Sequence, residues 1–188
     1  MDTTFEKRTL LHLIPDALAP LLDYPSDDFL NRIHRLESML DELDVLPACY
    51  QNLTALIDSL RDQSPDEWRE IYTTTFDMNP ACHLYASIHL FGEENFKRSM
   101  LMARLADAFE SEGFSHSGGE LPDFIPVLLR FATFLGPGEK STGLIAELVV
   151  PTLIQAREKT AAQAAWPFAA VCLACTVLEI YLQRISHD

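Results

Sequence analysis

The sequence predicts an all-α protein, a single compact bundle of about eight helices. All seven glycines of the 188-residue chain lie between positions 92 and 143, so the first 91 residues and the last 45 contain none. Strand-rich folds usually need glycine in their turns, whereas long glycine-free stretches rich in Leu, Ala and Glu are typical of helices. In these stretches the apolar residues recur every three or four positions, which is the helical period.

The helices of the first half are marked by apolar stripes and by one clear start signal. Apolar residues spaced by three or four predict one helix over 29–43 and another over 50–60. Ser64 suits a helix cap, Pro65 the first helical position, and Glu67 follows the cap by three residues. This pattern predicts the start of a third helix at Pro65.

Four more helical segments follow in the second half. A broad apolar face over 96–109 predicts a helix that ends at Gly113, because glycine suits the residue after a helix. Further helices are predicted over 121–135, over 141–159 with a kink or break at Pro151, and from Trp166 onward. Loops are expected near 24–26, 62–64, 77–80, 115–119 and 136–140. These loops are too short for interdomain linkers, so residues 1–188 are predicted to form one domain.

The chain is strongly acidic, with 28 Asp and Glu against 14 Lys and Arg and a formal net charge of −14. Nucleic acids and anionic lipid surfaces are poor partners for such a protein, since both attract Lys and Arg. Residues 1–80 carry most of the excess, 16 acids against 6 bases. The resulting field steers basic partners toward the protein. The alternative is that the charge only provides solubility, and the charge alone does not decide between the two.

The four cysteines favour a reducing compartment. Cys172 and Cys175 have the spacing of a redox pair, but they stand inside an apolar helical stretch with no strand before it, so core packing is favoured. No signal peptide is visible at the start, and no apolar run reaches the 18 residues needed to span a membrane. We therefore expect a cytoplasmic protein.

No specific catalytic constellation is present, and this predicts a protein that is not an enzyme and that holds no cofactor. The HExxH, P-loop, GxGxxG and GxSxG patterns are all absent. What remains is a concentration of polar and aromatic residues between positions 72 and 130. It includes Glu120 and Asp123, which the predicted helix 121–135 would place at its N-terminus, where carboxylates favour the helix dipole. Capping and partner binding are both open for these acids.

Four short motifs then resemble the NarJ family, the assembly chaperones of molybdenum-containing nitrate reductases, within the redox-enzyme maturation chaperones that also include the TorD and DmsD types. They are Leu-Leu-Asp-Tyr-Pro at 21–25, Tyr-Thr-Thr-Thr-Phe-Asp at 72–77, His-Leu-Phe-Gly-Glu at 89–93 and Glu-Leu-Pro-Asp-Phe-Ile-Pro at 120–126. Their order along the chain matches that of the family. Arg130 departs from the pattern, because an acid is common at that position.

The resemblance implies a TorD-like, all-helical cytosolic chaperone that takes part in nitrate assimilation. Such proteins bind the N-terminal leader, or its remnant, of the apo catalytic subunit of a molybdenum reductase, either nitrate reductase or a close relative. They assist molybdenum cofactor insertion and assembly of the complex. Cofactor-biosynthesis proteins and a second copy of the chain, in a homodimer, are further partners that the resemblance leaves open.

A receptor for a basic, apolar leader needs an apolar groove with carboxylates at its rim. We expect Phe76, Leu90, Phe91, Leu121 and Phe124 to line this groove, and Asp77, Glu93, Glu120 and Asp123 to lie near its rim. The peptide-binding residues predicted in this way are Tyr72, Phe76, Asp77, His89, Leu90, Phe91, Glu93, Glu120, Leu121, Asp123 and Phe124. Ordinary core packing is the alternative for each aromatic residue, and His89 is either a peptide contact or a structural histidine.

Two other functions stay open at this point. One is a metal- or ligand-binding helical domain, or a small enzyme, that uses Cys82, His83 and His89. The other is an adaptor for basic amphipathic helices with no role in metalloenzyme assembly.

Overall fold

The computed structural model describes residues 3–43, 47–78, 82–92, 95–116, 118–160 and 166–186. Within these residues the chain forms ten α-helical and two π-helical segments and no strand beyond one isolated β-bridge, so the predicted all-α class is confirmed. In chain order the segments are α1 (Thr3–Leu22), α2 (Phe29–Glu42), α3 (Pro47–Arg61), α4 (Pro65–Tyr72), η1 (Thr73–Asp77), α5 (Ala86–Phe91), α6 (Phe96–Glu112), α7 (Ile125–Phe134), α8 (Glu139–Leu144), η2 (Ile145–Val149), α9 (Val150–Thr160) and α10 (Trp166–Ser186).

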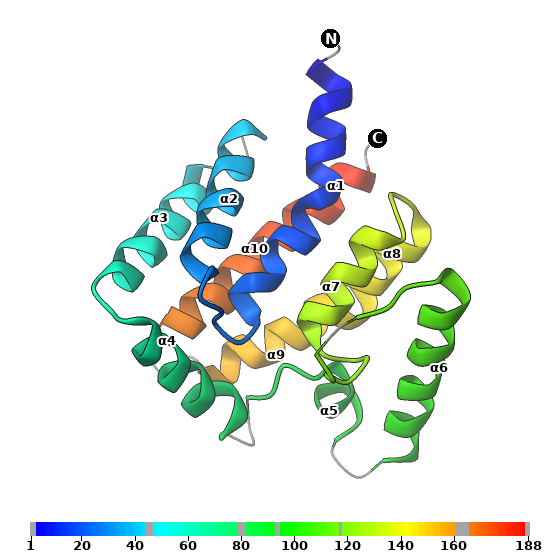
Figure 1. Cartoon of the computed structure of the whole chain (residues 1–188). Helices are drawn as coiled ribbons and strands as arrows, with labels where there is room; N and C mark the ends of the chain where they lie inside the picture. Colours follow the sequence, from blue (N-terminus) through cyan, green and yellow to red (C-terminus); the bar gives the residue numbers. More distant parts are fainter. Residues whose placement is uncertain are drawn as a thin grey trace.

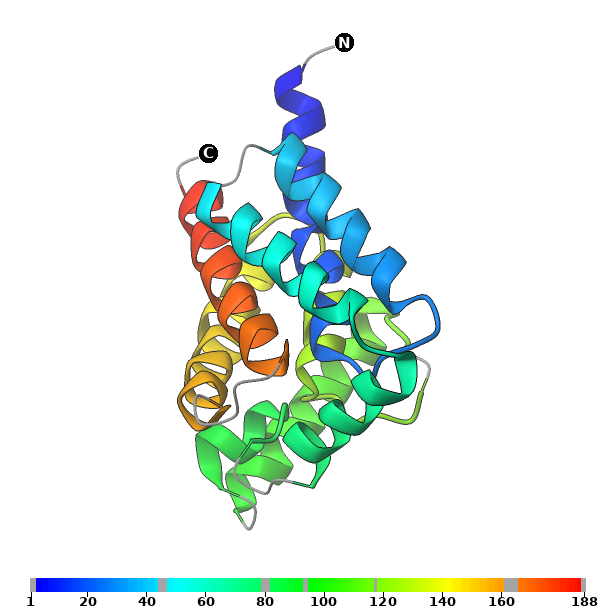
Figure 2. The same cartoon turned by 90° about the vertical axis from the view of Figure 1, so that its left-hand side faces the viewer.

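Helices α1 and α10 form the centre of the bundle (Figure 1). Helix α1 packs against α2, α7 and α10, and α10 packs in addition against α3 and α9. Figure 2 shows α2 and α3 side by side on one face of the molecule. Helix α1 was not predicted from the sequence, although its buried side chains Leu11, Ile14, Leu18 and Leu21 are spaced by three or four residues and form one apolar stripe.

The predicted helix start at Ser64 is confirmed in atomic detail. The Ser64 side chain accepts a hydrogen bond from the backbone N–H of Glu67, and the Glu67 carboxylate accepts one from the backbone N–H of Ser64 at 2.6 Å. The predicted end at Gly113 is confirmed as well, because Gly113 takes the left-handed conformation (φ 75°) that closes α6. Local sequence signals therefore set these two ends without help from tertiary contacts.

The helix predicted over 121–135 begins four residues later, at Ile125. The backbone before it is engaged elsewhere: Ala86 donates to the carbonyl of Asp123 at 2.9 Å, and Ile125 donates to the carbonyl of Leu84 at 2.8 Å. These bonds, to residues 37 and 41 positions earlier, hold residues 121–124 out of the helix, and local propensity does not reveal them.

The helix predicted over 141–159 is interrupted as expected near Pro151. The π-helical segment η2 separates α8 from α9 immediately before it. Proline has no backbone N–H to donate to the carbonyl four residues earlier, and a wider π-helical turn accommodates the loss.

Residues Trp166–Ile185 of α10 are long and apolar enough to cross a membrane by length and composition, and 44% of this window is buried inside the protein. Cys175 lies fully buried in the same helix, and Cys172 is half-buried beside it. Mid-helix placement is thus confirmed for both cysteines, and core packing for Cys175, whereas Cys172 lines a surface pocket. Burial raises the pKa of the Cys175 thiol to about 12, which keeps it in the unreactive protonated form.

Candidate functional site

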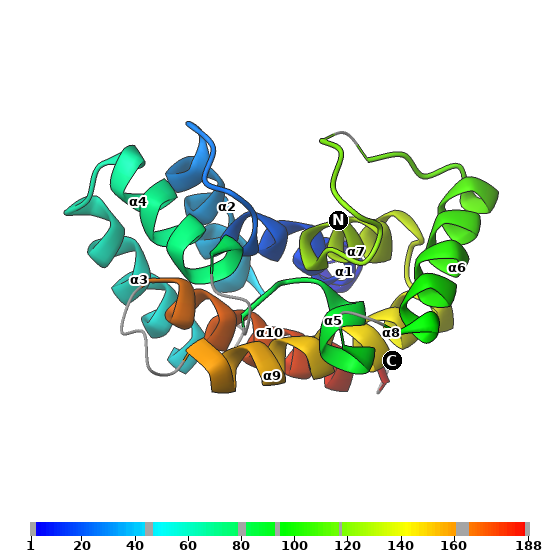
Figure 3. The same cartoon turned by 90° about the horizontal axis from the view of Figure 1, so that it is seen from below.

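The motif at 120–126 lies against residues 84–86, which lead into α5, at the lower end of the bundle (Figure 3). An isolated antiparallel bridge joins Tyr85 to Phe124, and their rings lie 5.2 Å apart. This bridge fixes the starts of α5 and α7 against each other. The residues just before α7, from Glu120 on, therefore lie beside the start of α5.

Three carboxylates from distant parts of the sequence gather here. Asp77 ends η1, Glu120 precedes α7, and Asp23 follows α1. The Tyr85 hydroxyl donates to the Glu120 carboxylate at 2.8 Å. Partial desolvation raises the pKa of Asp77, and the negative charge of Glu120 raises it further. The two carboxylates thus repel each other, and a cation bound between them would relieve that repulsion.

Exposed apolar side chains lie among these acids. Tyr24 is 51% exposed and packs edge-on against Tyr72, with 5.6 Å between the ring centroids. Met78 is 72% exposed and Leu121 is 40% exposed. The acids and these side chains form one surface, which we call the Asp77–Glu120 face. Its residues are Asp23, Tyr24, Asp77, Met78, Tyr85, Glu120 and Leu121.

Three of the predicted site residues are buried in the core beneath this face. Tyr72, Phe76 and Phe124 are 3%, 2% and 5% exposed, so the expectation that Phe76 and Phe124 line an open groove is wrong. The Tyr72 hydroxyl donates to the carbonyl of Leu22 at 3.2 Å, and its ring lies 5.0 Å from that of Phe76. These aromatic side chains pack in the core. Burying them against neighbouring helices removes apolar surface from water and so stabilises the fold.

Asp123 is also placed differently from the prediction. It is fully buried, not at the rim of a groove. Its Oδ2 accepts hydrogen bonds from the backbone N–H of Ser87 at 3.0 Å and from the Ser87 hydroxyl at 2.5 Å. Ser87 stands in the first turn of α5, so Asp123 caps that helix and not α7. Arg98 of α6 donates to the same hydroxyl at 3.0 Å, which ties a third helix to the network.

The predicted residues on α5 face a different neighbour. His89 Nε2 lies 2.5 Å from the carbonyl of His83, and Lys159 of α9 donates to His89 Nδ1 at 3.5 Å. Burial lowers the pKa of His89, consistent with a neutral ring that donates through one nitrogen and accepts through the other. The contacts of His89 therefore join α5 to α9. Leu90 and Phe91 are partly exposed beside it, and Glu93 lies outside the described residues.

Four members of the face were not predicted from the sequence: Asp23, Tyr24, Met78 and Tyr85. The motif at 21–25 was a signal for the first two, but its place in space depends on the packing of α1 on α7. Arg130, the departure from the family pattern, forms an ion pair with Asp23 at 2.5 Å. This pair links the 21–25 motif to α7.

Within the described residues, no three His, Cys, Asp or Glu side chains come close enough to hold a metal ion together. His83 and His89 are joined through a backbone carbonyl, and the Cys82 thiol is buried with its pKa raised to about 11. Their arrangement is explained by hydrogen bonding and packing.

The fold is that of the redox-enzyme maturation proteins. A solved structure of a protein from Archaeoglobus fulgidus, assigned to redox-enzyme maturation, superimposes on 89% of this chain and 93% of its own with a TM-score of 0.62, at 16% identity. The chain itself belongs to the nitrate reductase delta subunit family, whose model matches residues 43–166. This family consists of maturation chaperones and not of catalytic enzymes, in agreement with the prediction from the sequence.

Two curated relatives support the assignment. The NarJ protein of Bacillus subtilis, named as a nitrate reductase molybdenum cofactor assembly chaperone, is 27% identical over 132 residues, which are 70% of this chain and 68% of that protein. The nitrate reductase-like protein NarX of Mycobacterium tuberculosis is 30% identical over 154 residues, 81% of this chain. The match spans only 22% of NarX.

Proposed function

We propose that this protein is a cytoplasmic chaperone for the apo catalytic subunit of a molybdenum reductase, either nitrate reductase or a close relative. It binds the N-terminal segment of that subunit on the Asp77–Glu120 face and keeps the subunit ready for molybdenum cofactor insertion and complex assembly. The name of the Bacillus relative supports the class of client. The face supports the binding mode.

The observation that carries the binding mode is the convergence of two exposed acids with exposed apolar side chains. Asp77 and Glu120 come from separate segments, and Tyr24 and Leu121 stand exposed among them, whereas the neighbouring Asp23 is paired with Arg130. A basic leader with an apolar, helix-prone run presents the complementary chemistry. Apolar contacts supply most of the affinity, and the carboxylates steer the encounter and fix the orientation.

Isothermal titration calorimetry with a synthetic peptide tests the proposal. The peptide is the N-terminal segment of a molybdenum reductase catalytic subunit from the same organism. We expect saturable binding that weakens as salt is raised, because exposed charges are screened within about 8 Å at physiological ionic strength. An absence of heat and of binding at low salt would contradict the proposal.

Charge-neutralising variants locate the binding surface. Asp77→Asn and Glu120→Gln are each expected to weaken the peptide about two- to fivefold, the usual size of an exposed charge contribution. Asp58→Asn is the matched control, because Asp58 carries the same charge on α3 and pairs with Arg61 away from the face. Equal losses in all three variants would show that only net charge matters and that the face is not the site.

The adaptor function differs from this proposal only in its client. Affinity purification of the chaperone from its own cells, followed by mass spectrometry, separates the two. Recovery of a molybdenum reductase catalytic subunit supports the proposal, and recovery of unrelated basic helical proteins alone supports the adaptor.

A further inference from the structure

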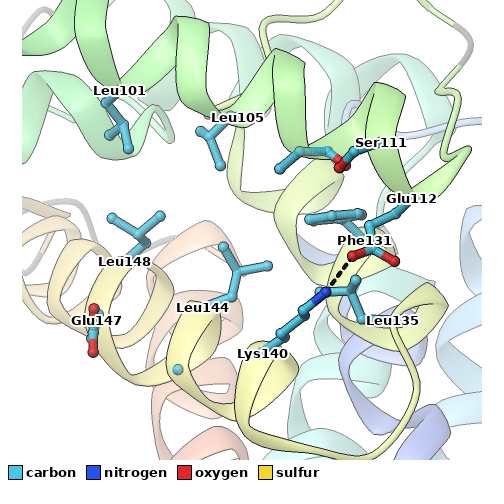
Figure 4. A pocket seen from close by; sticks show the side chains of 12 residues that line it. Leu101, Leu105, Ser111, Glu112, Phe131, Leu135, Lys140, Leu144, Glu147 and Leu148 are labelled. Carbon is cyan, nitrogen blue, oxygen red and sulfur yellow. Dashed lines mark hydrogen bonds and ion pairs between the residues drawn. The ribbon is translucent and has the colours of Figure 1, made fainter.

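Helix α6 lies along the outer edge of the molecule, on the side opposite α3 and α4 (Figures 1 and 3). Figure 4 shows the inner side of this helix, where Leu101 and Leu105 point toward Leu144 and Leu148 across a pocket between α6 and α8. The opposite side of α6 is therefore part of the outer surface of the protein.

Two large apolar side chains are exposed on this outer side. Phe96 is 78% exposed, and Met100, one helical turn later, is 39% exposed. The sequence pattern places both on the apolar face of the helix predicted over 96–109. The folded protein buries Leu105 and Phe109 of that face and leaves the first two residues in water. Covering them with a partner would remove apolar surface from water, which favours association.

Two basic side chains lie beside this apolar pair. Lys97 and Arg104 are exposed, and neither forms an ion pair with any residue that the structure describes. Helical spacing by three and four residues places them along one edge of the stripe that Phe96 and Met100 form. Residues 96–106 contain no acid, in a chain of net charge −14. We call the surface made by Phe96, Lys97, Met100 and Arg104 the Phe96–Arg104 face.

The stability of α6 does not explain Lys97. The start of a helix carries a partial positive charge, which favours acids there and disfavours bases, and Lys97 is the second residue of α6. The next base, Arg98, has a structural contact, because its side chain donates to the Ser87 hydroxyl at 3.0 Å. A carboxylate of a partner would give Lys97 the counter-charge that its own helix does not provide.

The charges farther along α6 favour a protein over a membrane as the partner. Basic and aromatic side chains on a helix also suit an anionic lipid surface. However, the exposed acids Asp107 and Glu110 follow Met100 and Ala103 by seven residues each, so they lie on the same side of the helix. A helix lying flat on a membrane would bring these acids to the lipid phosphates, where they would be repelled. A protein segment can cover residues 96–104 alone.

We propose that the Phe96–Arg104 face is a docking site for an acidic segment of a second partner protein. Apolar side chains of this segment cover Phe96 and Met100, and two of its carboxylates pair with Lys97 and Arg104. These two bases are seven residues apart, which is about 10.5 Å along a helix axis. The paired carboxylates are spaced to match, as acids seven residues apart on a partner helix are.

This partner is different in chemistry from the client segment assigned to the Asp77–Glu120 face. That face is acidic and takes a basic segment, whereas the Phe96–Arg104 face is basic and takes an acidic one. The two partners therefore do not compete for one surface, and the protein can hold both at once.

The probe for this site is a fluorescein-labelled helical peptide of about 15 residues, with two glutamates seven residues apart and leucines between them at helical spacing. Fluorescence anisotropy measures its affinity. We expect it to bind at least about fivefold more tightly than a version with glutamine for each glutamate, and this preference should shrink as salt is raised. Equal binding of the two peptides at low salt would contradict the proposal.

Charge reversal tests the location of binding. Lys97→Glu/Arg104→Glu is expected to weaken the glutamate peptide at least about tenfold. The same variant should bind a lysine version of the peptide at least about fivefold more tightly than the wild type does, because the charges are complementary again. Arg35→Glu/Arg61→Glu is the matched control: it changes the net charge equally, on α2 and α3, and should lose less than about twofold.

Truncation of the exposed ring tests the apolar part of the contact. Phe96→Ala is expected to weaken the glutamate peptide about three- to tenfold. Its Tm should stay within about 1 °C of the wild type, because the side chain is 78% exposed and supports little of the fold. The variant Asp77→Asn/Glu120→Gln should bind the peptide as tightly as the wild type, since its changes lie on the other face.

Four results would overturn the proposal. The charge-reversed variant retains the wild-type affinity although its Tm shows that it is folded. The control variant loses the peptide to the same extent, which shows that only net charge matters. Vesicles of phosphatidylglycerol bind the wild type but not Phe96→Ala, which makes a membrane the occupant. Sedimentation shows a wild-type dimer that Phe96→Ala dissociates, which makes a second copy of the chain the occupant.

Discussion

The carboxylate of Asp123 accepts two hydrogen bonds from Ser87, one from its backbone N–H and one from its hydroxyl. The two residues are 36 positions apart, and both are fully buried. Through this contact the segment before α7 caps α5, and Arg98 extends it to α6. A residue that the motif suggested for partner binding thus holds three helices in place beneath the face.

This contact predicts a structural phenotype for Asp123→Ala. The substitution leaves two buried donors of Ser87 with fewer partners, so we expect a loss of about 2–3 kcal/mol in the free energy of unfolding. Urea denaturation measures the loss. Asp123→Asn retains an oxygen that accepts from the backbone N–H and should lose less. An Asp123→Ala protein as stable as the wild type would show that the buried contact contributes nothing.

Replacing the Asp77 carboxylate with a neutral side chain is expected to stabilise the protein, by an amount that depends on pH. The pKa of Asp77 is raised in the folded state by desolvation and by Glu120, so its charged form destabilises the fold relative to the unfolded chain. The penalty is absent below the ordinary value of 3.8 and is complete above the raised pKa. Asp77→Asn should therefore unfold at higher urea concentration than the wild type at pH 7, and the difference should shrink as the pH falls toward 4.

Carboxyl NMR titration gives the direct check on this pair. In Glu120→Gln the titration midpoint of Asp77 should move down toward its ordinary value, because one source of repulsion is gone. A midpoint that does not move would show that desolvation alone sets the shift. The stability of Asp77→Asn would then be insensitive to the state of Glu120.

The Asp23–Arg130 pair predicts a measurable coupling energy. Both side chains are partly shielded, at 29% and 27% exposed, so the pair should exceed an exposed surface ion pair. A double-mutant cycle with Asp23→Ala and Arg130→Ala is expected to give about 1–2 kcal/mol in urea denaturation. The exposed Arg35–Asp28 pair is the matched control and should give about 0–0.5 kcal/mol. Equal couplings would contradict a special role for Arg130.

The cysteines predict slow alkylation in the folded protein. Burial raises the pKa of Cys82 to about 11 and that of Cys175 to about 12, so almost no thiolate exists at pH 8. Mass spectrometry after iodoacetamide treatment should find both thiols unmodified in the native protein and modified in concentrated urea. Rapid formation of a disulfide between Cys172 and Cys175 would instead restore the redox interpretation of this pair.

The local signals in the sequence predicted most helices and several of their ends. Some signals act over only a few residues and can be recognised from the sequence alone. They are the capping box at Ser64, the glycine at 113 and the break before Pro151. The start of α7 was wrong because backbone bonds to residues 84–86 decide it. For the same reason the sequence did not show which of the predicted site residues are accessible: Asp77 and Glu120 are exposed, whereas Phe76, Phe124 and Asp123 are buried.

The sequence by itself determined the all-α class, the family and the acidic character of the protein. Periodicity, short motifs and charge are properties of the chain that do not depend on how it folds back on itself. Only the tertiary structure decided which acids are accessible and which are structural, since that depends on contacts such as Asp23 with Arg130 and Asp123 with Ser87, 107 and 36 positions apart. It alone also left Phe96 and Met100 exposed, because the elements that pack against α6 decide which of its apolar side chains are covered.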